Sequence, residues 1–104
     1  MADFVTVATI DEIPNGTAKS FTINDQFIAV VNCDGTFYAI DNICSHAYAE
    51  LDQGEVDTDD CTIECPLHGS IFSLETGRPR TLPAVTPIAT YPVQIVGNEV
   101  QVAV

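Results

Sequence analysis

Apolar and polar residues alternate with a period of two along most of the chain, and turn-forming residues recur about every eight to twelve positions. Segments of this kind, rich in Val, Ile, Thr, Phe and Tyr, predict β-strands that bury one face. No stretch shows the apolar stripe of an amphipathic helix. We therefore predict an all-β fold built from short strands and tight turns.

The expected strands fill most of the sequence. Asp34-Gly35 is the strongest hairpin signal, because glycine accepts the positive φ of a type I′ turn. Asn24-Asp25 and Gly97-Asn98 are further turns, and residues 11–16 form a turn or one short helical turn. Strands are predicted at Phe4 to Thr9, Ala18 to Ile23, Gln26 to Asn32, Thr36 to Asp41, Cys61 to Glu64, Ser70 to Leu74, Ile88 to Ile95 and Glu99 to Val104.

The chain has 104 residues, enough for one domain with its own core, and it contains no linker, repeat or low-complexity tract. We therefore treat residues 1–104 as a single domain. The longest apolar run, Phe27 to Val31, is far shorter than a membrane span, and the start lacks the basic region of a signal peptide. These features predict a soluble, cytoplasmic protein.

Fifteen acidic residues against three basic ones give a net charge of −12, which excludes nucleic acid and anionic lipid as natural partners. Seven of the acidic residues lie between positions 47 and 64. Their spacing lacks the pattern and the glycine of an EF-hand loop. We therefore interpret this segment as a solvent-exposed hairpin and not as a calcium site.

Two short motifs carry the candidate chemistry: Cys44-Ser45-His46 and Cys65-Pro66-Leu67-His68. Each offers one thiolate and one imidazole, and together they use both histidines of the protein. A set of two cysteines and two histidines, in the order C-x-H and C-x2-H, suits a Rieske-type [2Fe–2S] cluster, in which two histidines replace two cysteines on one iron. We therefore predict Cys44, His46, Cys65 and His68 as ligands of such a cluster.

A structural zinc site is the alternative, since two cysteines and two histidines also satisfy tetrahedral zinc. Most small zinc modules draw two cysteines from one element and two histidines from another. Here each motif supplies one ligand of each kind, so the two cysteines can face one iron and the two histidines the other. The spacing therefore favours the cluster.

The residues around these motifs resemble the Rieske ferredoxins, the small electron carriers of bacterial aromatic-ring dioxygenases. Gly69 and Ser70 follow the second motif, the likeness is strongest from Asp41 to Phe72, and Tyr91-Pro92-Val93 continues it near the end. The resemblance implies stacked antiparallel sheets with a cluster-binding subdomain at about residues 42–78. It also implies that Cys44 and Cys65 hold the buried iron, and His46 and His68 the outer iron.

The number of histidines limits the function. A terminal oxygenase of this kind needs a second, mononuclear iron held by two histidines and a carboxylate, and this chain has no histidine left for one. The resemblance then implies a one-electron carrier, not an enzyme, that is monomeric and passes electrons from a flavin-dependent NAD(P)H reductase to a terminal oxygenase. The alternative is a Rieske-like subunit of a nitrite-reductase-type complex or a companion of iron–sulfur assembly.

Two cysteines remain, Cys33 at a turn and Cys61 in an expected strand. In a chain without a secretion signal we expect both to be free thiols, with a Cys33–Cys61 bridge as the less favoured alternative. The high-potential relatives of respiratory complexes clamp their ligand loops with a disulfide. That clamp is not expected here, because neither motif carries the extra cysteine.

The resemblance also implies a docking face and a control on the reduction potential. Partners are expected at the outer iron, framed by Tyr48, Pro66, Leu67 and Pro83. In high-potential relatives a serine and a tyrosine, at the positions of Ser70 and Phe72, donate hydrogen bonds to cluster sulfur. The alternative for Ser70 is a turn residue that bonds its own loop.

Overall fold

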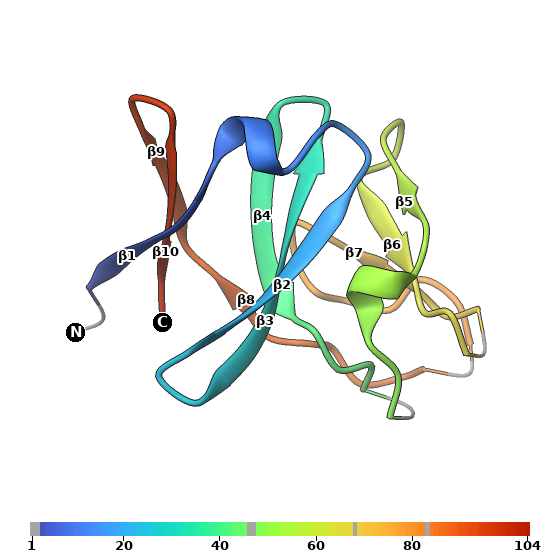
Figure 1. Ribbon diagram of the computed structural model, residues 1–104. Coiled ribbons are helices and arrows are strands. Elements are labelled where there is room, and N and C mark those ends of the chain that lie inside the picture. Colours follow the sequence, from blue (N-terminus) through green and yellow to red (C-terminus); the bar gives the residue numbers. More distant parts are fainter. Residues whose placement is uncertain (1–2, 46–47, 68, 83) are drawn as a thin grey trace.

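Three antiparallel sheets form the fold in the computed structural model, which describes residues 3–45, 48–67, 69–82 and 84–104 (Figure 1). These described residues contain no α-helix, so the all-β prediction is confirmed. The central sheet has the order β2-β3-β4-β8 and comprises β2 (Ala18–Ile23), β3 (Gln26–Cys33), β4 (Thr36–Asp41) and β8 (Thr90–Tyr91).

The β2–β3 and β3–β4 hairpins of the central sheet have the turns that the sequence predicts. Asn24 and Asp25 both have positive φ, at 50° and 65°, and so do Asp34 and Gly35, at 53° and 89°. Positive φ at both central residues defines the type I′ turn, whose twist matches that of the flanking strands. Each turn therefore fixes the register of the hairpin that it closes.

A second sheet closes the chain on itself by pairing its beginning with its end. Its order is β1-β10-β9, and a single 3₁₀ turn, η1 (Ile10–Glu12), follows its first strand as expected. The strands are β1 (Phe4–Thr9), β10 (Glu99–Ala103) and β9 (Val93–Val96).

The third sheet lies within the range expected to bind the cluster and has the order β5-β6-β7. A 3₁₀ turn that the sequence did not indicate, η2 (Leu51–Gln53), precedes it. Its strands are β5 (Val56–Asp57), β6 (Thr62–Glu64) and β7 (Ile71–Ser73).

Strand β3 separates two apolar cores. Its odd-numbered residues Ala29, Val31 and Cys33 face the core shared with the third sheet, and Ile28 and Val30 face the core shared with the second sheet. A strand covered on both faces needs apolar residues at consecutive positions. The run from Phe27 to Val31 is therefore the signature of the central strand of a sandwich.

One expected strand, Ile88 to Ile95, is two strands in different sheets. Residues 90–91 pair with β4, whereas residues 93–96 pair with β10. Pro92 stands between them, has no backbone N–H to donate, and offers its carbonyl oxygen to Ala103 N at 3.0 Å. The proline therefore marks the point at which the chain leaves one sheet for the next.

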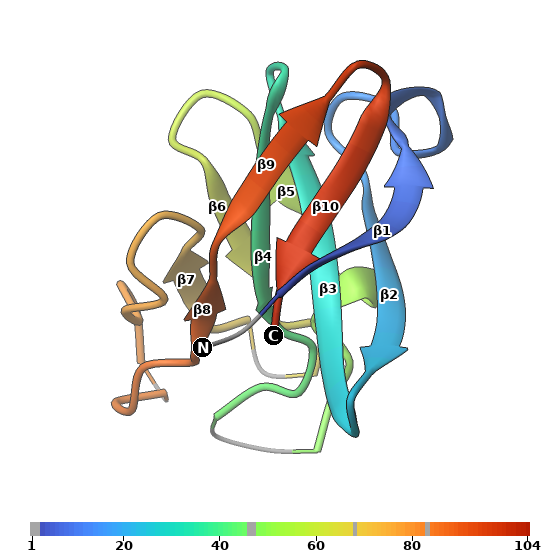
Figure 2. The same ribbon diagram turned by 90° about the vertical axis from the view of Figure 1, so that its left-hand side faces the viewer.

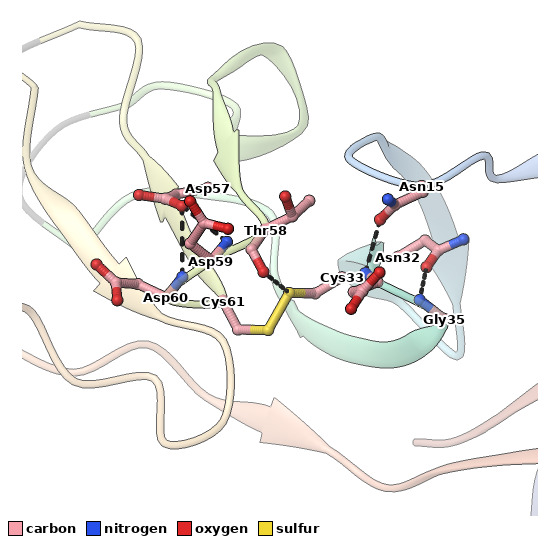
Figure 3. Close-up of a disulfide and its surroundings, with 10 residues drawn as sticks. Asn15, Asn32, Cys33, Gly35, Asp57, Thr58, Asp59, Asp60 and Cys61 are labelled. Atoms are coloured by element: carbon pink, nitrogen blue, oxygen red, sulfur yellow. Dashed lines mark hydrogen bonds between the residues drawn. A yellow bond between two sulfur atoms is a disulfide. The ribbon is translucent and has the colours of Figure 1, made fainter.

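The prediction of two free thiols was wrong, because Cys33 and Cys61 form a disulfide (Figure 3). Cys33 ends β3, and Cys61 lies in the turn before β6 with a positive φ of 52°. Packing of the third sheet on the central sheet brings their Cα atoms to 5.7 Å, within the range that a disulfide requires. The two residues are 28 positions apart, so no local pattern reports this contact.

Candidate metal centre

The first ligand loop, residues 43–50, leaves the end of β4 and returns to η2. Its base is closed by hydrogen bonds from Cys44 N to Ala49 O at 2.9 Å and from Leu51 N to Asn42 O at 2.6 Å. The Asn42 side chain is fully buried, and its Oδ1 accepts a hydrogen bond from Asp52 N at 2.9 Å. These bonds hold Cys44 at a fixed position beside the core.

The second ligand loop, residues 65–70, joins β6 to β7. Cys65 N donates to Ser70 O at 2.7 Å, and Gly69 N donates to Cys65 O at 3.0 Å. Gly69 has a φ of 76°, a conformation that costs glycine nothing but strains other residues. The glycine of the second motif therefore allows the tight turn that places Cys65 at the end of its strand.

A third loop, residues 79–88, is bound to both ligand loops. Ser45 Oγ donates to Thr86 O at 2.5 Å, and Ala84 N donates to Ser70 Oγ at 3.1 Å. Thr81 Oγ1 also accepts a hydrogen bond from Ile71 N at 2.9 Å. All three loops lie at one end of the molecule, the lower end in Figures 1 and 2.

The structure brings two of the four predicted ligands to the same core. Cys44 is 5% exposed and Cys65 is 1% exposed, and both belong to the cluster of buried residues between the central and third sheets. His46 and His68 lie outside the described residues. The thiol donors are thus placed by neighbouring loops and shielded from water.

This donor set fits an iron–sulfur cluster. Thiolate sulfur is the ligand that such clusters use, and a loop that already buries one thiol also carries one imidazole two or three positions later in the sequence. The described residues include no group of three or more metal-ligating side chains, so a metal site made only of them is not indicated.

Ser70 is fully buried, and its hydroxyl oxygen is an acceptor for Ala84 N. The bonded partner lies in the third loop and not in the loop of Ser70 itself. A hydroxyl that accepts one hydrogen bond still has its own proton to donate. Phe72, the other residue considered for control of the potential, is also fully buried.

Exposed apolar side chains gather on the same three loops. Tyr48 is 82% exposed and Leu67 is 56% exposed, and with Pro66 they line an open groove of about 250 Å³. Leu82 and Val85 in the third loop are 77% and 74% exposed, and sequence reasoning did not single them out. The signal available in the sequence was the apolar run Leu82-Pro83-Ala84-Val85, which lies between threonines in an irregular loop. Pro83, which was singled out, lies outside the described residues.

A partly buried hydrogen bond joins the end of β4 to β8. Tyr91 Oη donates to Asp41 Oδ1 at 2.6 Å, and Ala89 N donates to Asp41 Oδ2 at 3.1 Å. Burial of the phenol, together with its hydrogen bond to the Asp41 carboxylate and the charge of that group, raises the pKa of Tyr91 to about 12. The pair fixes the end of β4 three residues before Cys44.

The fold and the two buried thiols define an all-β protein with the sulfur donors of an iron–sulfur site. The profile of the Rieske [2Fe-2S] domain matches residues 3–92. The chain therefore belongs to the Rieske [2Fe–2S] domain family, and its cofactor is a Rieske-type [2Fe–2S] cluster.

Individual relatives show which kind of Rieske protein this chain is similar to. The 3-phenylpropionate/cinnamic acid dioxygenase ferredoxin subunit of Photorhabdus laumondii is 39% identical over 98 residues, which cover 94% of this chain and 91% of the relative. The ferredoxin of carbazole 1,9a-dioxygenase from Nocardioides aromaticivorans IC177 is 40% identical, with a TM-score of 0.94 and 98% of both chains covered. The resemblance to Rieske ferredoxins is confirmed.

A third comparison comes from a complex. In the complex of reduced oxygenase and oxidized ferredoxin in carbazole 1,9a-dioxygenase, one chain is 32% identical to this protein with a TM-score of 0.88. The match covers 96% of this protein and 92% of that chain.

No helix in the described part of the present structure is long and apolar enough to cross a membrane.

Proposed function

We propose that this protein is a one-electron carrier that delivers electrons to a terminal ring-hydroxylating oxygenase. The observation that carries the proposal is near full-length similarity to a dioxygenase ferredoxin subunit, at 39% identity over 94% of the chain. A relative of known structure, at 40% identity, is likewise named as the ferredoxin of a dioxygenase. The protein is then an electron-transfer component and not an oxygenase.

Four residues are assigned as ligands in this proposal. Cys44 and Cys65 hold the inner iron, because both thiols are buried against the core. His46 and His68 hold the outer iron, as the similarity to Rieske ferredoxins implies. When bound, the cluster accepts and releases one electron at a potential of about −150 to +300 mV, which neutral imidazole ligands raise above that of an all-cysteine ferredoxin.

The proposed partners are a flavin-dependent NAD(P)H reductase and the oxygenase, bound in turn by a monomeric, cytoplasmic carrier. Support for the oxygenase comes from the structural relative solved in a complex with one. A carrier that serves two partners needs brief contacts, and redox complexes typically bury less than about 1,200 Å². A small apolar surface at the cluster suits such a contact.

We assign that surface to the apolar rim, defined as Tyr48, Leu67, Leu82 and Val85. These four side chains are exposed and belong to the loops that surround the two buried thiols. Electron transfer falls off steeply with distance, so partners should dock on the end of the molecule that carries the loops. The net charge of −12 acts at longer range and steers the carrier toward basic patches on both partners.

Reconstitution tests the function. The cluster-loaded protein is mixed with NADH, a flavin-dependent reductase and a ring-hydroxylating oxygenase, and oxidation of the oxygenase's substrate is followed. Turnover that requires this protein, and a complex that dissociates on gel filtration, support a free carrier. A permanent complex with a nitrite-reductase-type enzyme or an assembly factor supports the alternative and would overturn the proposal.

A further inference from the structure

The geometry points to a second redox element: we propose that the Cys33–Cys61 disulfide is a reducible brace that holds the two ligand-bearing strands together. Opening it should loosen the third sheet and speed loss of the cluster. The proposal rests on the cluster and its two buried thiols. It does not depend on which reductase or oxygenase the protein serves.

The disulfide and the ligand cysteines lie at opposite ends of the same strands. Strand β6 begins directly after Cys61 and ends directly before Cys65. Strand β4 follows the turn after Cys33 and ends three residues before Cys44. The β3–β4 and β5–β6 turns lie at the upper end of Figure 1, and the ligand loops at the lower end. The bridge therefore fixes the far ends of the strands that deliver both thiols.

Apart from the bridge, the third sheet is held to the central sheet through a shared apolar core. No strand of the third sheet forms a ladder with the central sheet among the described residues, so the contact between them is made by side chains. Strand β5 has two residues, and β6 and β7 have three each. Sheets this short are marginal without external support. A covalent link at their edge thus adds to the support that the shared core gives these short strands.

The two sulfur atoms differ in access. Cys33 is 1% exposed, whereas Cys61 is partly exposed in the turn that precedes β6. A thiolate from solvent can therefore reach Cys61 Sγ more easily than Cys33 Sγ. Figure 3 shows the bridge at the edge of the third sheet, beside the turn formed by residues 57–60.

A hydrogen-bond acceptor for the reduced form of Cys33 lies next to its sulfur atom. Cys33 Sγ lies 3.5 Å from the carbonyl oxygen of Thr58 (Figure 3). In the disulfide this sulfur carries no proton, so the contact becomes a hydrogen bond only when Cys33 is a thiol. Reduction therefore leaves the buried thiol with an acceptor already in place.

The reductant we propose is a dithiol. One of its thiolates attacks Cys61 Sγ, the bond between the two protein sulfurs breaks, and Cys33 leaves as a thiolate that takes up a proton. The second thiol of the reductant then attacks the mixed disulfide, releasing Cys61 as a thiol and leaving the reductant as a cyclic disulfide. Two electrons and two protons pass from the reductant to the protein, and the cluster takes no part.

The surroundings of the bridge disfavour an anionic monothiol such as glutathione. The Asp57 carboxylate accepts hydrogen bonds from Asp59 N and Asp60 N, and this places three carboxylates on the turn beside Cys61. Like charges repel an approaching anion, and salt screens that repulsion. Disulfides in cytosolic proteins are rare and usually transient or redox-sensing, which agrees with a bridge that a dithiol can open.

The test compares the cluster-loaded wild type with the double variant Cys33→Ser/Cys61→Ser, each with and without dithiothreitol. Alkylation and mass spectrometry report whether the bridge opens in the folded protein. Amide hydrogen exchange reports the third sheet, and absorbance in the presence of an iron chelator reports cluster loss. We expect dithiothreitol to open the wild-type bridge, to lower protection of residues 56–64 about tenfold and to speed cluster loss, since a closed loop contributes substantially to stability.

The double variant is the matched control. It should lose its cluster as fast as the reduced wild type, and dithiothreitol should change nothing further. The proposal is overturned if the bridge resists dithiothreitol until the protein unfolds, if opening it leaves exchange and cluster loss unchanged, or if dithiothreitol accelerates cluster loss equally in the variant. None of these measurements needs a redox partner, so their failure would leave the proposed carrier function untouched.

Discussion

At the scale of single residues, we propose that the hydroxyl of Ser70 donates a hydrogen bond to the cluster. It is buried, it accepts a hydrogen bond from Ala84 N, and its proton is still available to a second acceptor. A hydrogen bond to cluster sulfur favours the reduced, more negative state. Ser45, in the first ligand loop, differs because its hydroxyl proton is already donated to Thr86 O.

Ser70→Ala should therefore lower the reduction potential by about 50 mV, the equivalent of about one hydrogen bond for one electron. Phe72→Tyr, which introduces a hydroxyl at a buried position, should raise it. Ser45→Ala is the matched control and should have the smaller effect. Redox titration checks all three, and equal potentials in wild type and Ser70→Ala would contradict the role given to this hydroxyl.

Tyr91 gives a prediction on pH. Its pKa is raised to about 12 by burial and by the carboxylate of Asp41, so the folded state holds the phenol proton more tightly than the unfolded state. The stability that this group contributes is fully present below about pH 10, the usual pKa of tyrosine, and is lost as the pH rises toward 12.

Ultraviolet titration of the folded protein should show one phenol ionising near pH 12, and this step should be missing in Tyr91→Phe. The protein contains three tyrosines, so this step should account for one third of the total phenolate absorbance. Complete ionisation of all three by pH 11 in the folded protein would contradict the structural assignment.

At the scale of elements, the first ligand loop depends on Asn42. Its main-chain oxygen and its side-chain oxygen accept hydrogen bonds from two successive residues of η2, Leu51 and Asp52. Removing the side chain leaves Asp52 N without this acceptor in a partly buried setting. Asn42→Ala should lower the free energy of unfolding by about 1–3 kcal/mol.

Chemical denaturation of the cluster-loaded protein followed by circular dichroism measures this loss. Gln53→Ala, in the same 3₁₀ turn but with an exposed side chain, is the control and should change stability by less than about 0.5 kcal/mol. Equal midpoints for the two variants would show that the loop is held by other contacts.

Elements with local signals were predictable, and those set by distant contacts were not. The bounds of β1, β2 and β4 agree with the prediction, because alternation and turn glycines are local features. The split at Pro92 depends on which sheet each half meets, and the disulfide depends on how two sheets pack. In the site, the sequence motifs placed Cys44 and Cys65 in loops. The exposure of Leu82 and Val85 depends on how the third loop folds, so it could not be predicted from the sequence.

At the scale of the whole molecule, docking should divide into an apolar contact and a charge effect. Leu67→Asp should slow electron transfer to the oxygenase at every ionic strength, because it places a charge in the apolar rim. Val96→Asp is the control, since Val96 is 51% exposed on β9, compared with 56% for Leu67. Stopped-flow absorbance of the cluster measures the rates. Equal slowing by both variants would show that the docking surface is not the apolar rim.

Charge reversal should act differently. Glu50 lines the groove beside Leu67, so Glu50→Lys should weaken the dependence of the transfer rate on salt more than it changes the rate at high salt. Attraction between exposed charges is screened beyond about 10 Å at 0.1 M salt. If the salt dependence stays the same in this variant, the charge of Glu50 does not contribute to steering the protein toward its partner.

Pulsed EPR spectroscopy of the chemically reduced protein, combined with iron and sulfide analysis, tests the identity and the ligands of the cluster. We predict two irons and two inorganic sulfides per chain, as the [2Fe–2S] domain implies, and nitrogen couplings from two imidazoles, His46 and His68. Single replacement of either histidine should remove one coupling or the cluster. A reduced cluster without nitrogen coupling, or a colourless protein with stoichiometric zinc, would contradict the assignment of a Rieske-type cluster to these ligands.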